Sequence, residues 1–147
     1  MDTSVTTSKP ISERGKLRTN LQLSNNVLKN EMRAFLEQFD ITPQQFGILN
    51  ILREANGEPL STNDICEKMI DKMSDTSRIV DRLISKNLVW KQPCPHDGRK
   101  IQVFISSEGQ YLLSTIDTKL KNLDTLFSKL SEVETRQLNA LLEKILL

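Results

Sequence analysis

The change of hydrophobic period at Asn87 constrains the fold more than any other feature of this chain. Before it, residues 76–83 carry apolar side chains at helical spacing, which predicts an amphipathic helix from about Asp75 to Lys86. After it, residues 101–106 alternate apolar and polar side chains, as in a half-buried strand. Asn87 stands just past the helix end, where a left-handed residue is favoured and Asn is the usual second choice after Gly. The sequence therefore predicts a helix that leads directly into a β-hairpin.

A partner strand and a preceding helix complete this pattern. Residues 88–92 are the predicted antiparallel partner, and the Asp-Gly pair at 97–98 is the tight-turn signal, in a loop lengthened by the Pro-Cys-Pro run at 93–95. Upstream, Ser61 precedes a short apolar pattern and has Asp64 three residues on, a capping-box variant that opens a helix. Two short helices followed by a β-hairpin are the order of a winged helix-turn-helix.

The helix predicted over residues 75–86 has a small, polar and basic outer face. Ser74 is predicted to cap it, with Asp75 in the first turn, where the helix dipole favours a negative charge. Residues 72–104 hold seven basic side chains against three acidic ones, although the whole chain is nearly balanced with 20 against 19. A helix of this kind fits the major groove of DNA. The helix and hairpin together predict nucleic-acid binding; the simpler interpretation is that the arginines only solvate a surface helix.

Three short patterns resemble the MarR family of bacterial winged-helix transcription factors, the multiple antibiotic resistance regulators. Residues 77–83, SRIVDRL, are similar to the family's recognition-helix pattern, and the Leu-Val pair at 88–89 follows where the family has Gly-Leu-Val. Residues 97–99 and 105–109 are similar to the family's wing pattern, D-x-R and then L-T-x-x-G. Gly98 stands where the family often has Arg, so one basic group is missing at the wing tip. With the flanking helices, the resemblance covers about residues 12–146.

The resemblance implies a mainly α-helical fold with a small β-wing, in which a winged helix-turn-helix is flanked by N- and C-terminal dimerisation helices. We expect residues 1–11 to be a disordered tail and residues 12–147 to form a single MarR-type domain. Within it, residues 42–106 are the expected DNA-binding part, and residues 12–39 and 107–147 are the expected dimerisation helices.

Both end segments carry apolar stripes at helical spacing. The stripes consist of Leu17, Leu21, Leu28, Met32, Phe35 and Phe39 in the first segment, and of Leu113, Ile116, Leu120, Leu123, Phe127 and Leu130 in the second. The second stripe has the spacing of a heptad seam, and a capping box at Ser131 and Glu134 opens a last, leucine-rich helix. Packing of these helices on each other in a monomer is one interpretation. The resemblance favours interdigitation between the two subunits of a homodimer.

The residues expected to contact DNA share a place on the predicted recognition helix or wing. The expected readers of the major groove are Ser74, Asp75, Ser77 and Arg78. Phosphate contacts are expected from Arg82 and Lys86, while Arg99 enters the minor groove or meets the backbone with the assistance of Lys100. Asp81 and Asp97 are expected to orient these arginines through ion pairs. The expected partner is a pseudo-palindromic operator in double-stranded DNA.

The resemblance further implies a repressor that is modulated by a small aromatic or anionic ligand, although the sequence does not locate the ligand-binding pocket. Two alternatives remain open. A winged helix of near-neutral total charge also fits a protein-interaction module that binds no DNA. A thiol-responsive regulator would use Cys94, which lies between two prolines in the predicted wing loop and is expected to be exposed.

Other classes of function find little support in the sequence. His96 is the only histidine, no glycine-rich phosphate loop occurs, and Cys94 with His96 makes a poor zinc site, so we expect no enzyme activity, catalytic residue, cofactor or metal. The first residues lack the apolar region of a secretory signal, and no apolar run approaches the ~18–20 residues that span a bilayer. Two cysteines without a disulfide framework fit a reducing compartment. We therefore expect a cytoplasmic protein without a membrane partner.

Overall fold

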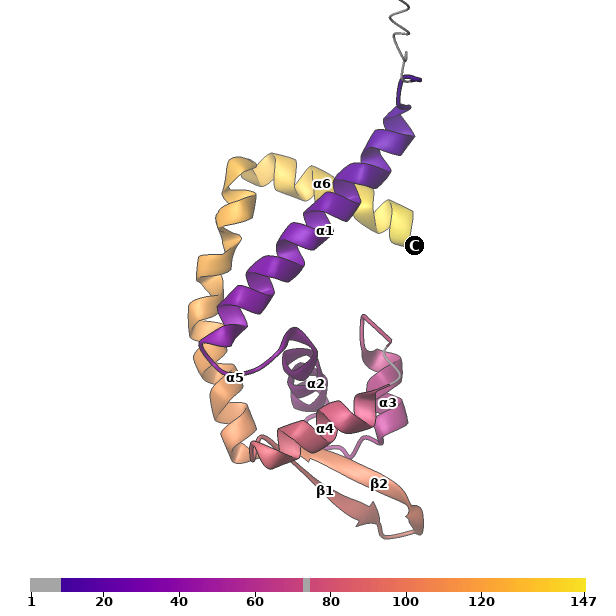
Figure 1. Cartoon of the computed structure of the whole chain (residues 1–147), viewed down its shortest axis with the longest axis vertical. Helices are drawn as coiled ribbons and strands as arrows, with labels where there is room; N and C mark the ends of the chain where they lie inside the picture. Colours follow the sequence, from indigo (N-terminus) through magenta and orange to yellow (C-terminus); the bar gives the residue numbers. More distant parts are fainter. Residues whose placement is uncertain (1–8, 73–74) are drawn as a thin grey trace, which may run out of the picture.

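The structure, a computed structural model, describes residues 9–72 and 75–147, apart from the side chains of Asp124 and Thr125. Its elements follow one another as α1 (Glu13–Glu37), α2 (Pro43–Glu54), α3 (Thr62–Lys68), α4 (Thr76–Ser85), β1 (Val89–Cys94), β2 (Asp97–Ile105), α5 (Ser107–Leu120), the 3₁₀ helix η1 (Lys121–Lys129) and α6 (Glu132–Leu146). Helices α2, α3 and α4 and the hairpin form one end of the molecule, and α1 and α6 lie at the other, connected by α5 (Figure 1). This arrangement confirms the predicted mainly helical winged helix-turn-helix with flanking end helices. The predicted disordered tail falls mostly on residues 1–8, outside the described part.

Hydrogen-bonding side chains set the starts of most helices. Ser61 and Asp64 form the predicted capping box at α3, and Ser131 and Glu134 form the one at α6. A further capping box opens α2, where the side chain of Thr42 accepts the N–H of Gln45 and the side chain of Gln45 accepts the N–H of Thr42. These boxes satisfy backbone donors that a helix start leaves free. The predicted cap of α4, Ser74, lies outside the described residues. Asp75 stands at the N-cap position and its side chain makes no capping bond, so the prediction that it lies in the first turn of α4 is wrong.

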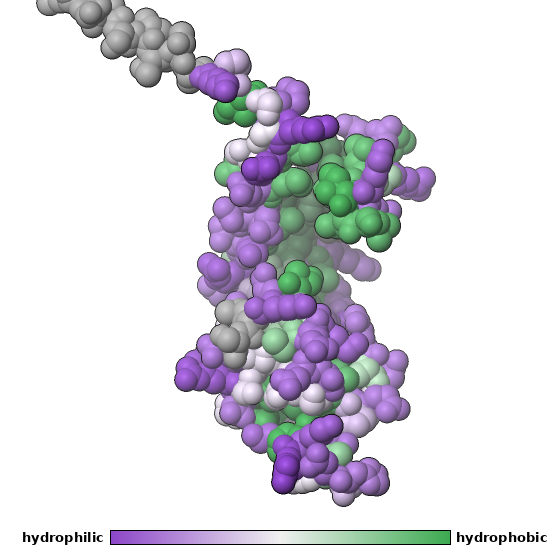
Figure 2. Space-filling model, turned by 90° about the vertical axis from the view of Figure 1, so that its right-hand side faces the viewer, coloured by the Kyte–Doolittle hydropathy of each residue, from purple (hydrophilic) through white to green (hydrophobic). Residues whose placement is uncertain are grey.

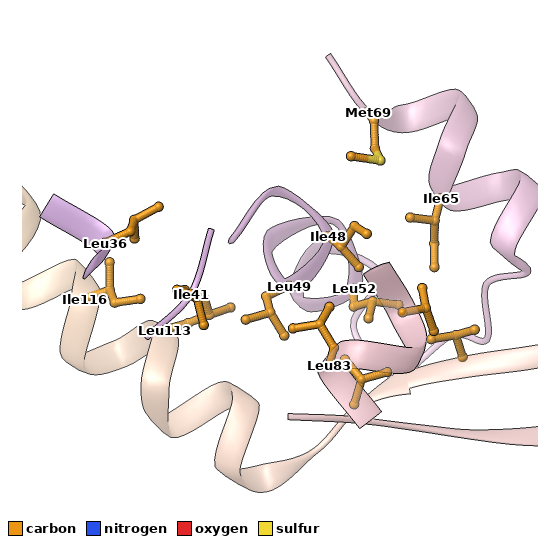
Figure 3. Close-up of a cluster of buried hydrophobic side chains, with 13 residues drawn as sticks. Leu36, Ile41, Ile48, Leu49, Leu52, Ile65, Met69, Leu83, Leu113 and Ile116 are labelled. Carbon is orange, nitrogen blue, oxygen red and sulfur yellow. The ribbon is translucent and has the colours of Figure 1, made fainter. Parts of the chain in front are cut away.

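Helix α2 is the centre of the buried core. Ile48, Leu49 and Leu52 of α2 are buried against side chains from the end of α1 and from α3, α4 and α5 (Figure 3). Those partners include Leu36, Ile65, Met69, Leu83, Leu113 and Ile116. Val89 and Val103 bring the wing into the same cluster. One continuous core therefore holds the recognition helix, the wing and α5 in a fixed relation.

The joint between α4 and β1 follows the prediction for Asn87. This residue has a φ of 61°, and its backbone N–H and that of Leu88 donate to the carbonyls of Ile84 and Leu83, which closes the helix end. The start of α5 packs directly on this turn. A Cβ atom added to Gly109 would lie 2.3 Å from the carbonyl oxygen of Leu88, so the approach of α5 to the turn requires glycine.

The hairpin turn differs from the prediction. The antiparallel ladder pairs Val89 with Ile105 and continues to Pro93 with Ile101, but Cys94 then pairs with Asp97, so the turn is made by the Pro-His pair at 95–96. The predicted turn at the Asp-Gly pair 97–98 is wrong, because these residues begin β2. The side chain of Asp97 accepts the backbone N–H of Arg99 at 3.1 Å. This local bond holds residues 98–100 as an irregularity in the strand rather than as the hairpin turn.

Beside the wing, a single bridge pairs Leu60 with Val103. One other expectation holds only in part. The seam predicted from Leu113 to Leu130 begins in α5, where Leu113 and Ile116 are fully buried, but the α-helix ends at Leu120 and continues as the 3₁₀ helix η1. Phe127 in η1 is 42% exposed. The second half of the seam therefore lacks a full covering within the single chain.

The two end helices expose most of their apolar side chains. No residue of α6 is buried, and Leu146 is 82% exposed. The exposed apolar residues of these helices are Leu17, Leu21, Leu23, Val27 and Leu28 in α1, and Val133, Leu138, Leu141, Ile145 and Leu146 in α6. Apolar surface gathers at this end of the molecule in the space-filling view (Figure 2). The single chain leaves an apolar patch of a kind that monomeric proteins rarely expose.

Candidate nucleic-acid interface

The outer face of α4 is polar because its other face is used by the core. Thr76, Val80 and Leu83 are buried, as the helical period predicts. The side chains that point away from this core are exposed, and they are Asp75, Ser77, Arg78, Asp81, Arg82 and Ser85. Five of the eight residues expected to contact DNA lie on α4 or at its two ends, namely Asp75, Ser77, Arg78, Arg82 and Lys86.

A cleft of about 520 Å³ separates α4 from the wing and the start of α3. From α4 it is lined by Ser77 and Asp81, and from the wing by Arg99 and Lys100. The structure thus places the predicted wing contacts beside the recognition helix, on one side of the molecule. Lys91 of β1 and residues 61–64 at the start of α3 line the same cleft, and they are not among the residues that the sequence predicts to contact DNA.

A second groove, of about 230 Å³, lies on the other side of α4. Arg78 and Arg82 line it together with Thr42 and Gln44 from the start of α2. Neither Thr42 nor Gln44 is among the residues that the sequence predicts to contact DNA. Their nearness to the arginines follows from the packing of α2 against α4. The sequence feature that could have indicated these residues as part of the site is the polar helix start at residues 42–45, just before the helix-turn-helix.

The acidic residues of the site have other partners than predicted. The carboxylate of Asp81 lies 3.0 Å from Nζ of Lys91, so it joins α4 to β1. The carboxylate of Asp97 accepts the backbone N–H of Arg99. The expectation that these two carboxylates pair with arginines is therefore wrong. Lys91 faces α4 from the inner side of the hairpin, and this placement is decided by the ladder register.

Hydrogen bonds at the start of α3 keep an ionised carboxylate at the rim of the cleft. The backbone N–H of Ser61, and then its hydroxyl, hold the pKa of Asp64 below the ordinary value of 3.8. The cleft therefore has two carboxylates, Asp64 and Asp81, against the three cations of Lys91, Arg99 and Lys100. Its net charge favours an anionic partner, and the carboxylates limit where that anion can sit.

Lys86 takes a different direction from the other basic residues of α4. Its Nζ donates to the backbone carbonyl of Asp40 and lies 3.5 Å from Oε1 of Gln45 and 3.7 Å from Oδ2 of Asp40. The side chain is 32% exposed. Its ammonium group is directed at the corner between α1 and α2.

Other candidate groups form no second site in the described part of the chain. Cys94 is half-buried rather than exposed as predicted, because it lies in the ladder, where Nε2 of Gln102 approaches its Sγ at 3.9 Å. Among the residues that the structure describes, no group of three or more His, Cys, Asp or Glu side chains is arranged to hold a metal ion. Within the same residues, no helix is both long and apolar enough to cross a membrane.

Comparison with known proteins points to one group of regulators. The sequence model of the MarR family matches residues 39–100 of this chain. The HTH-type transcriptional repressor IacR of Pseudomonas putida is 32% identical over 115 residues, which cover 78% of this chain and 68% of IacR. The uncharacterised HTH-type transcriptional regulator YsmB of Bacillus subtilis is 28% identical over 129 residues, which cover 87% of each chain.

Solved structures show the same likeness in three dimensions. A mutant of MarR from E. coli, crystallised with operator DNA, superposes with a TM-score of 0.81 at 25% identity, covering 95% of this chain and all of that chain. The complex of S. aureus MepR with DNA gives a TM-score of 0.77 at 27% identity, covering 88% of this chain and 95% of that one. The likeness extends over the end helices as well as over the part that contains the clefts.

Proposed function

The chain belongs to the MarR family, and from this premise we propose that it is a transcriptional regulator that binds a pseudo-palindromic operator in double-stranded DNA as a homodimer. One observation carries the proposal. The arginines of α4 and the basic residues of the wing lie on one exposed side of the molecule, beside the two grooves that flank α4. A helix with this face and a basic hairpin fit the major groove and the adjacent backbone or minor groove.

The proposed roles follow from where each side chain lies. Asp75, Ser77 and Arg78 stand on the exposed face near the start of α4, where base edges of the major groove are within reach. Ser74 is proposed for the same role, although it lies outside the described residues. Arg82, one turn further along, is placed to meet phosphates. Arg99 is proposed to enter the minor groove or meet the backbone, and Lys100 to assist it.

The homodimer is supported by the apolar surface that the single chain leaves open. Residues 12–39 and 107–147 are proposed as the dimerisation helices and residues 42–106 as the DNA-binding part. Burial of a leucine side chain contributes about 1.5–3 kcal/mol, and α6 holds several that the single chain leaves exposed. A second copy that covers this patch would place two recognition helices on one duplex, as half-sites of a pseudo-palindrome require.

The direction and control of regulation are further parts of the proposal. Two relatives, IacR of Pseudomonas putida and MdtR of Bacillus subtilis, are named as repressors, which supports a repressor here. We propose control by a small aromatic or anionic ligand and no enzymatic activity, in line with the family resemblance. A cytoplasmic location follows from the proposed contact with DNA.

In-vitro selection of bound duplexes tests this function and separates the two proposed readers. Arg78→Ala should relax base preference at one position of each half-site, because a bidentate contact of Arg to guanine discriminates by about 1–3 kcal/mol. Arg99→Ala should weaken binding to all sequences more evenly and flatten the salt dependence by about one to two charges per dimer. The half-sites should lie about 10 bp apart, centre to centre.

Two results would count against these assignments. If the affinity for duplex DNA does not fall steeply with salt concentration, a protein-interaction module is favoured over a DNA-binding protein. A selected motif that is unaltered by Arg78→Ala but changed at its centre by Arg99→Ala would mean that the two readers are assigned the wrong way round.

A further inference from the structure

The last cation of α4, Lys86, is only partly exposed and is directed at another part of the same chain. The donors of Lys86 meet three oxygen atoms at the corner between α1 and α2, namely the backbone carbonyl of Asp40, its carboxylate and the side-chain carbonyl of Gln45. An ammonium group has three donor hydrogens and no acceptor. The hydrogen bond to the Asp40 carbonyl, with the other two oxygens at 3.5 and 3.7 Å, directs the ammonium group at the corner, so a contact to phosphate would require it to turn away.

The corner that receives Lys86 is a constrained piece of backbone. Asp40 has a φ of 54°, a left-handed conformation that non-glycine residues adopt infrequently. Its N–H donates to the carbonyl of Glu37 in the last turn of α1, and the next residue, Ile41, is buried. Gln45 is also buried, and its side chain accepts the N–H of Thr42 at the start of α2. Lys86 thus touches the point where α1 ends and α2 begins.

The same row of α4 carries the proposed DNA contacts. Arg78, Arg82 and Lys86 are spaced by four residues, so they follow one side of the helix. Arg78 and Arg82 line the groove beside α2, and Lys86 ends the row at the corner. A displacement of the end of α4 from this corner would move both arginines relative to α2. It would also change the relation of α4 to α1, which bears part of the exposed apolar patch.

We propose that Lys86 is a positioning residue that fastens the end of the recognition helix to the α1–α2 corner, rather than a contact to DNA phosphate. This inference rests on the proposed function, because its consequence is read in operator binding. Lys86 then makes an internal contact instead of the phosphate contact that its place in line with Arg78 and Arg82 predicts from the sequence. The Lys86 side chain then links the end of the recognition helix to the end of α1, in addition to the core that the two helices share.

The salt dependence of operator binding separates the two roles. Lys86→Met keeps the aliphatic stem and removes the charge, and Arg82→Met is the matched control one turn earlier. A lost phosphate contact lowers the slope of log affinity against log salt by about 0.9 per subunit, so by about two per dimer. We expect this of Arg82→Met. For Lys86→Met we expect an affinity loss of about fivefold or more with the slope unchanged. A slope reduced as much as in the control overturns the inference.

A double-mutant cycle with Asp40→Asn tests the coupling itself. Asn accepts the left-handed conformation and keeps the backbone carbonyl, but it removes the carboxylate near Lys86. If Lys86 acts through this corner, the effects of Lys86→Met and Asp40→Asn on operator affinity are less than additive. If Lys86 touches phosphate, loss of the Asp40 carboxylate leaves affinity unchanged or raises it, and the two effects add. The additive result overturns the inference.

Hydrogen exchange of the DNA-free protein keeps this test independent of the proposed function. Lys86→Met should raise amide exchange at residues 40–45 several-fold by loosening the corner, while Arg82→Met should leave these residues unchanged. Unchanged exchange in Lys86→Met overturns the inference even if DNA is bound. Failure of the unaltered protein to bind any selected duplex would instead overturn the proposed function, and the exchange result would still decide whether Lys86 holds the corner.

Discussion

At the scale of single residues, two glycines with opposite surroundings offer a matched test of packing. Gly109 lies in the first turn of α5 against the carbonyl of Leu88, and an added Cβ would approach that oxygen to 2.3 Å and Cγ1 of Ile105 to 2.8 Å. Gly47 lies within α2, where an added Cβ would meet nothing within 4 Å. The cost of a methyl group therefore depends on the neighbouring element rather than on glycine as a residue type.

We expect Gly109→Ala to lower the free energy of unfolding by about 1–3 kcal/mol, because backbone must move to admit the methyl group. Gly47→Ala should raise it by about 0.4–1 kcal/mol, because alanine restricts the unfolded chain and favours a helix. Urea unfolding of both variants measures the two changes. Equal effects of the two substitutions would show that α5 does not approach the turn at Leu88 as closely as described.

At the scale of elements, the starts of α3 and α6 each depend on the ionisation of one carboxylate. Ser61 donates to the carboxylate of Asp64 at the start of α3, and its hydroxyl accepts in return. Hydrogen bonds from Ser131 lower the pKa of Glu134 at the start of α6 in the same way. In both cases the ionised carboxylate is the form that caps the helix. The stability of these helix starts therefore depends on pH.

The direction of this pH dependence follows from the lowered pKa of Asp64. Because the folded pKa lies below the unfolded one, the stabilisation is present above the ordinary value of 3.8 and is lost as the pH falls through the folded pKa. Ser61→Ala removes the hydroxyl that accepts the N–H of Asp64 and should cost about 0.5–2 kcal/mol at neutral pH, while Asp64→Asn keeps that bond and removes the ionisable carboxylate. The difference in thermal stability between Asp64→Asn and the unaltered protein should shrink on acidification below about pH 4, because the carboxylate is then protonated in the unaltered protein as well. A difference that stays constant with pH would show that the box does not act through an ionised carboxylate.

At the scale of the whole molecule, the apolar patch on α1 and α6 determines the expected assembly. Leu142 and Leu146 lie one turn apart on α6, where no side chain is buried within the chain. Replacing both by Asp places charges where the proposed interface needs apolar surface. We expect sedimentation at micromolar concentration to show about twice the chain mass for the unaltered protein and the chain mass for this variant, with loss of operator binding.

The control for this prediction carries the same added charge on the same helix. Gln137→Asp together with Asn139→Asp adds two carboxylates at exposed polar positions of α6. This variant should remain a dimer and bind the operator. An unaltered protein that sediments as a monomer would contradict the proposed dimer, and with it the expected two-fold symmetry of the operator. A dimer that survives both charge pairs would place the interface away from α6.

The sequence by itself determined the features that arise from neighbours along the chain. The capping boxes at Ser61 and Ser131, the left-handed Asn87 and the buried face of α4 depend on side chains within about four residues of one another. Their spacing is visible in the sequence, and their hydrogen bonds form within one helical turn. The prediction of two helices followed by a hairpin, and of the exposed basic face, rested on such local patterns and was confirmed.

Only the tertiary structure decided the contacts between elements that are distant in sequence. The Asp-Gly pair at 97–98 has the composition of a hairpin turn, but the ladder register places the turn two residues earlier. Asp81 pairs with Lys91 because the hairpin folds its inner face toward α4. Lys86 meets Asp40, 46 residues away, because α2 packs between α1 and α4. Which partner each charge meets is determined by the packing of a shared core, and no residue spacing in the sequence encodes that choice.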